Sequence, residues 1–307
     1  MNHVFYEQTY GVEIELTGIT RRRAAEVIAN YYGTRSEHAG TYYDKYVAYT
    51  RDGRKWTAMS DGSIHCERRR GVSANSEYSC EVVTPILRYD DMEDLQNVVR
   101  ALREAGAFAN SSCGIHVHVG ADKQNAYTVT CLANLFLKRQ ELIDEACENA
   151  DRSRWCARLN AKLVAKMRAT EKTKAALKPV WYGSLNEGGY DGMSEYAMSE
   201  HYNQTRYHGL NLHAWYTKGT IEFRLFNGTN HAGKIKAYVQ FCLALTTYAI
   251  RQEEMTNRDC NARFAKTSNL SREEKGKAMM NFLEDRLQLT GAEFKTCRLH
   301  MTSAFTD

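Results

Sequence analysis

The sequence predicts an α+β protein built on an antiparallel sheet, and three observations support this fold class. Short segments alternate apolar and polar residues, which is the period of a strand with one buried face. An Asp52-Gly53 pair between two further β-rich segments is a strong hairpin signal. Other segments carry apolar residues at helical spacing and would cover the apolar face of the sheet. The alternating segments are residues 11–16, 78–84, 114–120, 210–214 and 220–226.

The composition is that of a globular protein of enzyme size. The 307 residues can form one large domain or two small ones, and 43% hydrophobic residues exclude a disordered chain. The 41 basic and 37 acidic residues balance to +4, which is too little to predict nucleic-acid binding. Without a long apolar run or an N-terminal signal peptide, we expect a cytoplasmic protein that binds no membrane. Nine scattered cysteines without a CxxC pair favour reduced thiols over a disulfide framework or a structural zinc site.

In the first 90 residues we expect several strands and one helix. Thr20 is a suitable N-cap for this helix, and Gly33 would end it. Asp61 lies in a turn directly after the hairpin, while the arginine-rich stretch at 66–76 indicates an exposed loop. The expected elements are a strand at 11–16, a helix at 21–32, strands at 46–51 and 55–59, a turn at 60–64 and a strand at 78–84.

Helices dominate the prediction beyond residue 90. A Gly- and Tyr-rich stretch at 181–204 indicates a lid or substrate loop, because long loops of this kind inside compact domains usually have a function. Ser271 opens a capping box. We expect a catalytic domain over 1–252 and a helical C-terminal extension over 253–307 packed on it. The expected helices are 91–104, 123–149, 151–178, 232–251 and 271–289, with a hairpin formed by 207–215 and 219–226.

The polar faces of these strands carry unusual residues. Strands are depleted in Glu, and like charges on neighbouring strands destabilise a sheet, so several carboxylates on one face are unfavourable unless a cation or substrate compensates them. The alternative is an ordinary solvated face. The repetition of the pattern over several strands favours a functional site. The residues concerned are Glu13 and Glu15, Glu81, His116 and His118, Asn211 and His213, and Glu222 and Arg224.

This set of side chains favours divalent metal ions and a phosphate-bearing substrate. Carboxylate oxygens suit Mg²⁺ and Mn²⁺, whereas a His-x-His pair alone would also suit zinc or iron. The excess of glutamates over imidazoles, and their lack of obvious cationic partners in the sequence, favour the hard ions. Arg224, two residues after Glu222, suits the charge that develops on a transferring phosphoryl group. Because no Walker A or dinucleotide-binding motif is present, metal and arginine would have to handle the phosphates.

Five motifs in this order resemble the putative amidoligase family of the carboxylate–amine ligase superfamily, to which glutamine synthetase and γ-glutamylcysteine synthetase belong. The resemblance spans about residues 10–251 and implies a curved antiparallel sheet like that of the glutamine synthetase catalytic domain, with helices on its apolar face. It also implies that ATP, held by Mg²⁺ or Mn²⁺, phosphorylates a carboxylate to an acyl phosphate, which an amine attacks to give an amide. The motifs are Gly-Val-Glu-Ile-Glu at 11–15, Asp-Gly-Ser at 61–63, Glu-Val-Val-Thr-Pro at 81–85, Gly-Ile-His-Val-His-Val at 114–119 and Thr-Ile-Glu-Phe-Arg at 220–224.

The resemblance assigns roles to individual residues. Of the two histidines, His116 is preferred as a metal ligand and His118 as a nucleotide contact. Asp61 or Glu77 would replace a further acidic ligand of better-known members, and Asp61 or a lid tyrosine could be the base. The remaining assignments are Glu13, Glu15, Glu81 and Glu222 as metal ligands, Arg224 as the phosphoryl-stabilising residue, Arg206 as a phosphate contact and Asn211 as a substrate or nucleotide contact.

Three other functions are compatible with these residues. An ATP:guanidine phosphotransferase would need more arginines around the nucleotide and a reactive cysteine. A metal-dependent hydrolase would turn over without ATP. An inactive binding module would be expected to have lost some of the ligands, which are all present. The partners expected for a ligase are a carboxylate and an amine, as small molecules or peptides, and no nucleic acid.

Overall fold

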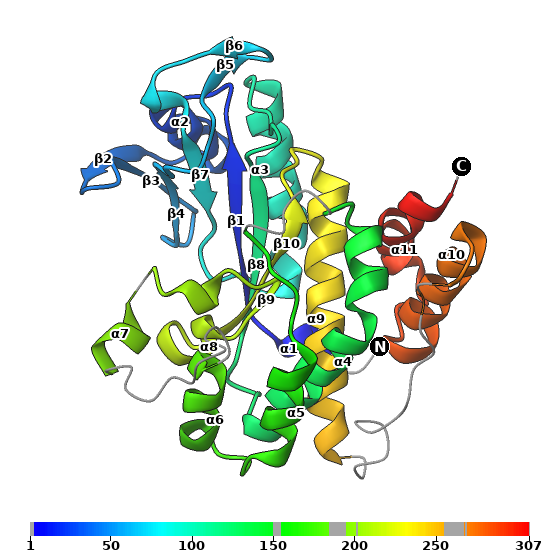
Figure 1. The fold of residues 1–307 in the computed structure, drawn as a ribbon. Coiled ribbons are helices and arrows are strands. Elements are labelled where there is room, and N and C mark those ends of the chain that lie inside the picture. The colour runs from blue at the N-terminus through cyan, green and yellow to red at the C-terminus, as the bar shows by residue number, and fades with distance from the viewer. Residues whose placement is uncertain are drawn as a thin grey trace. The chain divides into compact units, whose positions relative to one another are not determined.

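The structure is a computed structural model that describes residues 3–149, 155–183, 195–200, 202–254, 267 and 269–306. It is an α+β fold with a large antiparallel sheet and helices (Figure 1). The chain forms two compact units that interleave along the sequence. Unit 1 consists of Met1–Gln8, His118–Leu225 and Gln240–Asp307, and unit 2 consists of Thr9–Val117 and Phe226–Val239.

Unit 2 contains most of the strands, in the hydrogen-bonded order β2-β3-β4-β7-β1-β8. The pairs β2–β3, β3–β4, β4–β7 and β1–β7 are antiparallel. Strand β8 contributes its first residues to this unit and its last to unit 1. The strands are β1 (Tyr10–Leu16), β2 (Ser36–Gly40), β3 (Lys45–Tyr49), β4 (Lys55–Met59), β7 (Cys80–Val83) and β8 (Gly114–Gly120).

The register gives this sheet one apolar and one mixed face. Ile14 lies opposite Val82, and Val82 opposite Ala58, so these three side chains share a face, and all are buried. Helix α2 (Arg21–Tyr32) contacts β3, β4 and β7 and packs against α3 (Met92–Glu104). The alternation in the sequence therefore correctly indicated which side chains form the core.

Local signals in unit 2 were read correctly in part. Thr20 caps α2 by accepting a hydrogen bond from the Arg23 amide, and Gly33 ends the helix at φ 66°. The hairpin between β3 and β4 is present, although only Gly53 of its turn has positive φ. The stretch at 66–76 contains no buried residue, as expected of a surface segment, but the prediction of a loop is wrong, because the stretch contains a small hairpin of β5 (Glu67–Arg69) and β6 (Val72–Ser73). Strand β2 was not predicted, because its residues are largely polar and exposed.

Unit 1 contains the end of β8, followed in the sheet by β10 (Thr220–Asn227, whose last two residues belong to unit 2) and β9 (Leu210–Asn211). The expected strand at 210–214 is too long. Asn211 ends it, because its side-chain oxygen accepts a hydrogen bond from the His213 amide, and α8 (His213–Thr217) begins there. His213 therefore starts a helix and does not lie on the polar face of a strand.

The helices of unit 1 are shorter and more numerous than expected. The continuous helix predicted at 151–178 is two helices, since Asn160 and Thr173 each cap a new one. The capping box at Ser271 is present, and a further helix near the C-terminus was not predicted. The helices are α1 (His3–Glu7), α4 (Ala126–Ala146), α5 (Ala161–Ala169), α6 (Lys174–Tyr182), α7 (Glu195–Ser199), α9 (Ala232–Glu254, shared with unit 2), α10 (Arg272–Asn281), a π-helical turn at Phe282–Arg286 and α11 (Lys295–Thr302).

The remaining expectations concern the lid, membrane-spanning helices and the cysteines. Most of the lid predicted at 181–204 lies outside the described residues. Among the helices that the structure describes, none combines the length and apolarity needed to cross a bilayer. Seven cysteines of the described part form no disulfide, but Cys131 on α4 is disulfide-bonded, so the expectation of reduced thiols is wrong for this residue.

Candidate functional site

Unit 2 gathers acidic side chains and one imidazole on the mixed face of its sheet. We call this group the carboxylate cluster. Its strand residues come from β1, β7 and β8, and Asp61 joins them from the turn after β4. The alternation along each strand directs these side chains to the face opposite the apolar core. The cluster consists of Glu13, Glu15, Asp61, Glu81 and His116.

His116 lies between the two glutamates of β1. Its Nδ1 is 2.9 Å from Glu13 Oε2, and its Nε2 is 3.6 Å from Glu15 Oε1. The second oxygen of Glu15 accepts a hydrogen bond from the Gly114 amide. The side chains of Glu15 and His116 are only 5% and 3% exposed. Both glutamates and the imidazole are thus held in place by contacts within the unit.

Glu81 belongs to two groups of possible ligands. One ligand atom each from Glu13, Glu81 and His116 lies within 4.8 Å of the others, and the same holds for Glu15, Asp61 and Glu81. Asp61 is fixed at the start of its turn, where its Oδ1 accepts hydrogen bonds from the Ser63 amide and hydroxyl, both at 2.6 Å. Two adjacent groups that share one carboxylate are suited to two neighbouring divalent ions.

Two buried carboxylates of this cluster face each other across neighbouring strands. Glu15 lies directly opposite Glu81 in the β1–β7 register, and both side chains are buried. Like charges directly opposite on neighbouring strands destabilise a sheet, and burial strengthens their repulsion. The donor set, mostly carboxylate oxygens with one imidazole, fits Mg²⁺ and, better, Mn²⁺.

Unit 1 carries a second group, which we call the Glu222 network. Glu222 Oε1 accepts a hydrogen bond from Arg224 at 2.6 Å, and its Oε2 accepts one from the Asn211 amide at 2.7 Å. His118 Nε2 is 3.7 Å from Glu222, while its Nδ1 is 3.0 Å from the Thr220 hydroxyl. Glu222 therefore has a cationic partner, and the expectation that it lacks one is wrong. Residues i and i+2 of a strand share a face, which brings Arg224 to it.

Tyr207 links the two arginines expected at the phosphates. The Arg224 guanidinium lies 5.8 Å from the centroid of its ring, and that of Arg206 lies 5.6 Å from the same centroid. Arg206 ends the 3₁₀ turn Gln204–Arg206, and the Arg224 amide donates to Gly209, which fixes the spacing between the two chain segments. Cation–π contacts of this kind hold guanidinium groups in place without neutralising them. No pattern in the sequence predicted the contacts of Tyr207 with these two arginines.

A buried hydrogen-bond chain supports the Glu222 network from behind. Asn211 uses both ends of its amide, donating to Glu222 and accepting from the His213 amide at 2.8 Å. The imidazole of His213 is in turn hydrogen-bonded through Nδ1 to the Tyr182 hydroxyl at 2.8 Å. The side chain of Asn211 is therefore hydrogen-bonded at both ends within unit 1, and its contact with a substrate or nucleotide stays a prediction. The sequence placed His213 on the polar face of a strand and Tyr182 in the lid, but their contact was not predicted, since it joins residues 31 positions apart.

The structure brings most of the predicted site residues into these two groups. Of the two candidates for the additional acidic ligand, Asp61 lies in the carboxylate cluster, and Glu77 lies exposed in a 3₁₀ turn. Asn211 is placed behind Glu222 and not on an open surface.

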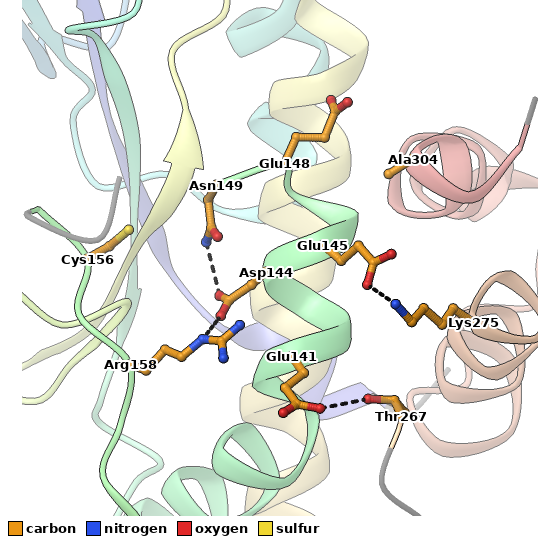
Figure 2. A pocket seen from close by; sticks show the side chains of 10 residues that line it. All are labelled: Glu141, Asp144, Glu145, Glu148, Asn149, Cys156, Arg158, Thr267, Lys275 and Ala304. Atoms are coloured by element: carbon orange, nitrogen blue, oxygen red, sulfur yellow. Dashed lines mark hydrogen bonds and ion pairs between the residues drawn. The ribbon is translucent and has the colours of Figure 1, made fainter. Parts of the chain in front are cut away.

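A separate cavity of about 850 Å³ lies in unit 1 and is lined by none of the predicted site residues (Figure 2). Acidic residues of α4 line one wall, and Lys275 on the opposite side reaches Glu145 at 2.7 Å. Arg158 pairs with Asp144 in the same cavity. Asp144 and Glu145, two of the four acids that line this cavity, are therefore paired with basic side chains.

Comparison with known proteins identifies the family of the chain. A family model described as putative amidoligase enzyme matches residues 6–246 of the 307. No match to a curated protein was found. The matched range includes every residue of the carboxylate cluster and of the Glu222 network.

Proposed function

Because the chain belongs to the putative amidoligase enzyme family, we propose that it is an ATP-dependent ligase that joins a carboxylate to an amine. The observation that best supports this proposal is the pair of ligand groups sharing Glu81. Buried carboxylates opposite each other in a sheet are costly for folding, so their retention suggests binding of cations. A nucleotide with its metal ions supplies such cations and the phosphoryl group for activation.

The proposed reaction has two steps. A carboxylate oxygen of the first substrate attacks the γ-phosphorus of ATP, and ADP leaves. The nitrogen of the amine then attacks the carbonyl carbon of the acyl phosphate; phosphate leaves, and the nitrogen loses a proton. Activation is needed because a carboxylate is inert to amines at neutral pH. The protein's task is to position both substrates and to stabilise charge on the transferring group.

Each group of residues has a part in this scheme. Glu13, Glu81 and His116, together with Glu15 and Asp61, would hold Mg²⁺ or Mn²⁺ ions, which neutralise phosphate charge when bound. Arg224 would contact the transferring phosphoryl group, and Arg206 the nucleotide phosphates. Glu222 is proposed as a further ligand, and Asn211 holds its carboxylate in a fixed orientation. We assign Asp61 to the metal side because it belongs to the group with Glu15 and Glu81.

The fold proposed with this function is that of the glutamine synthetase catalytic domain, whose sheet is curved around the nucleotide. The antiparallel pairs and the covering of the apolar face by α2 are compatible with it. We propose that the mixed face of the sheet is the concave, substrate-binding one.

Three cysteines lack the lowered thiol pKa that the reactive cysteine of a guanidine phosphotransferase needs. Such an enzyme needs a reactive thiolate, which forms only where the thiol pKa is low. Burial raises the pKa of Cys80 and of Cys297 to about 12, and it also raises the pKa of Cys66. These three cysteines are therefore protonated at neutral pH. The ligase interpretation needs no thiolate.

The proposal is tested by ATP turnover with mixed substrates. The protein is incubated with ATP, Mg²⁺ and pools of carboxylates and amines, and the release of ADP and phosphate is measured together with new amide products by mass spectrometry. We expect ADP release that requires both substrates and is abolished in Glu81→Gln. Product formation without ATP would support the metal-dependent hydrolase, and the absence of any nucleotide binding would contradict both the ligase and the phosphotransferase.

A further inference from the structure

We propose that the outer strands of unit 2 carry a second substrate subsite, which binds an anionic group of the carboxylate substrate through Arg35 and Lys55 beside Tyr49. The inference rests on the proposed function and adds a substrate class: an elongated molecule with a second negative charge remote from the carboxyl group that is activated.

The sheet register places this subsite on the same face as the carboxylate cluster. Directly opposite residues of antiparallel strands share a face, and a continuous row of them crosses five strands. Tyr49 and Lys55 are also directly opposite each other, and each lies two residues from a member of this row, so they point to the same side. The row is Glu13 on β1, Val83 on β7, Thr57 on β4, Val47 on β3 and Glu37 on β2.

The cations of the subsite are held around one aromatic ring. The Arg35 guanidinium lies 5.5 Å from the centroid of the Tyr49 ring, and the Lys55 ammonium lies 5.8 Å from it. The Tyr49 hydroxyl donates to the Glu37 carboxylate, which fixes the ring. Lys45 lies on the same face, two residues before Val47, and its ammonium lies 5.8 Å from the centroid of the Tyr43 ring. The net charge is positive, opposite to that of the carboxylate cluster.

A neutral surface separates the two charged poles. Met59 lies opposite Glu81, and Thr57 opposite Val83, and all three neutral side chains are half-buried. They form the floor between the carboxylate cluster and the cations. Along one face of the sheet, the acidic side chains proposed to bind metal are followed by neutral side chains and then by cations. This arrangement matches a ligand with two separated negative groups.

An anion fits the outer pole better than the adenine of the nucleotide does. Adenine would need an open aromatic face for stacking, but the Tyr49 ring already contacts two cations. Cations held in this way keep their outward charge available, since the ring attracts them without neutralising them. The chemistry therefore favours a carboxylate or another small anion.

The geometry sets the length of the substrate. Neighbouring strands lie about 4.8 Å apart, and two residues along a strand span about 7 Å, so the path from Glu13 to Lys55 and Tyr49 is roughly 12–16 Å. An extended peptide covers about 3.3–3.6 Å per residue, so four residue steps, with three residues between the two carboxylate-bearing positions, cover this distance.

A peptide series tests the subsite by its length dependence. The probes are blocked peptides with two glutamates separated by zero to five glutamines, together with matched peptides in which the second glutamate is glutamine. Binding is measured by calorimetry, with and without Mg²⁺ and a non-hydrolysable ATP analogue. We expect the tightest binding at a spacer of about three residues. At this length the affinity should be roughly tenfold higher than that of the peptide with one glutamate, since each exposed ion pair contributes about two- to fivefold and the second glutamate would pair with both Arg35 and Lys55.

Variants connect this optimum to the named residues. In Arg35→Gln/Lys55→Gln the peptides with two glutamates should bind no better than those with one, whereas Arg22→Gln, an exposed arginine of α2, should preserve the length dependence. A flat dependence in the wild-type protein, or one unchanged by the double variant, would overturn the subsite. Loss of nucleotide binding in the double variant with an unchanged peptide optimum would also overturn it and place the nucleotide there. Thermal stabilisation by Mg²⁺ and ATP alone reports on the proposed ligase function, so the two proposals fail separately.

Discussion

The carboxylate cluster and the Glu222 network contain similar side chains in opposite electrostatic situations. In the cluster, Glu15 and Glu81 lie opposite each other, with His116 as the nearest imidazole. In the network, a single buried carboxylate is hydrogen-bonded on one oxygen to Arg224 and on the other to Asn211. On the proposed function, bound cations would stabilise the first arrangement, whereas the carboxylate of the second already has protein partners on both oxygens.

This difference suggests ligand binding for the carboxylate cluster and the positioning of Arg224 for the Glu222 network. A group of carboxylates that repel each other gains stabilisation from any ion that enters, so it favours ligand binding. A fully hydrogen-bonded ion pair gains little from a ligand but holds its guanidinium in a fixed place, which favours transition-state stabilisation. We therefore expect substitutions in the two groups to differ in sign and kind.

The largest expected difference is in stability without ligand. Glu222→Gln leaves the Arg224 charge buried without its carboxylate, and breaking a buried pair costs about 3 kcal/mol or more. Glu81→Gln removes repulsion with Glu15, so the free energy of unfolding should stay unchanged or rise by a few tenths of a kcal/mol. Urea denaturation of the metal-free variants in EDTA measures both. Equal destabilisation by the two substitutions would remove the distinction.

The next effect concerns turnover. Arg224→Lys keeps the charge beside Glu222 but loses the planar fork that can contact two phosphate oxygens. We expect nucleotide affinity to be largely preserved and acceptor-dependent ADP release to fall about a hundred- to thousandfold, equivalent to about 2.7–4 kcal/mol. Calorimetry and a coupled ADP assay give the two quantities. Full turnover, or a loss of nucleotide binding as complete as in Glu222→Ala, would contradict the role assigned to Arg224.

Metal and nucleotide should stabilise the protein through the carboxylate cluster. At about 100 times its dissociation constant, a ligand that binds only the folded state adds about 2.7 kcal/mol. We expect this gain with Mg²⁺ or Mn²⁺ plus ATP, its reversal by EDTA, and its loss in Glu81→Gln. Differential scanning fluorimetry detects the shift. A wild-type protein that melts at one temperature with every nucleotide–metal pair would rule out this use of the cluster.

The sequence predicted the cluster because strand alternation alone determines which residues share a face. Two residues that are two positions apart on a strand lie on the same face, whatever the rest of the fold. This was enough to pair Glu13 with Glu15 and His116 with His118. The direct opposition of Glu15 and Glu81 depends on strand register, which is set by contacts between residues far apart in the chain. The repulsion that defines the cluster could therefore be suspected from the sequence but not assigned to this pair.

The network and several local elements were less predictable. The chain from Tyr182 through His213 to Asn211 depends on packing of α6 against the start of α8, for which no local pattern exists. The hairpin of β5 and β6 was hidden by its charged composition, although Gly71 at φ 75° marks its turn. Strand β10, with a strong alternating pattern, was predicted correctly.

Asn211 allows the positioning role of the network to be measured. Asn211→Asp loses the amide that donates to Glu222 and places two carboxylates together, so we expect a loss of about 2 kcal/mol in the free energy of unfolding. Tyr182→Phe removes only the hydroxyl bonded to His213 and should cost about 1 kcal/mol. Denaturation of both variants measures these values. If Asn211→Asp is as stable as the wild type but binds substrate poorly, Asn211 contacts substrate as the sequence suggested.

The smallest expected effect is a change in the pH dependence of stability, and it tests another buried polar group of unit 1, His208. His208 is buried beside Trp181, and its Nδ1 lies 2.9 Å from the Thr205 carbonyl, to which it donates. Burial lowers the pKa of His208 below its usual 6.5, and the hydrogen bond to Thr205 only partly opposes this shift. The folded protein therefore holds the imidazole neutral at a pH where the unfolded chain already binds a proton. The stability from this group is present above about pH 6.5 and is lost as the pH falls through the lowered pKa, with a slope of at most about 1.4 kcal/mol per pH unit.

Urea denaturation between pH 8 and pH 5 should show a smaller loss of stability for His208→Gln than for the wild type, with His231→Gln, at an exposed histidine, as the matched control. Parallel pH profiles for the wild type and His208→Gln would show that this imidazole does not contribute to the acid sensitivity of unit 1.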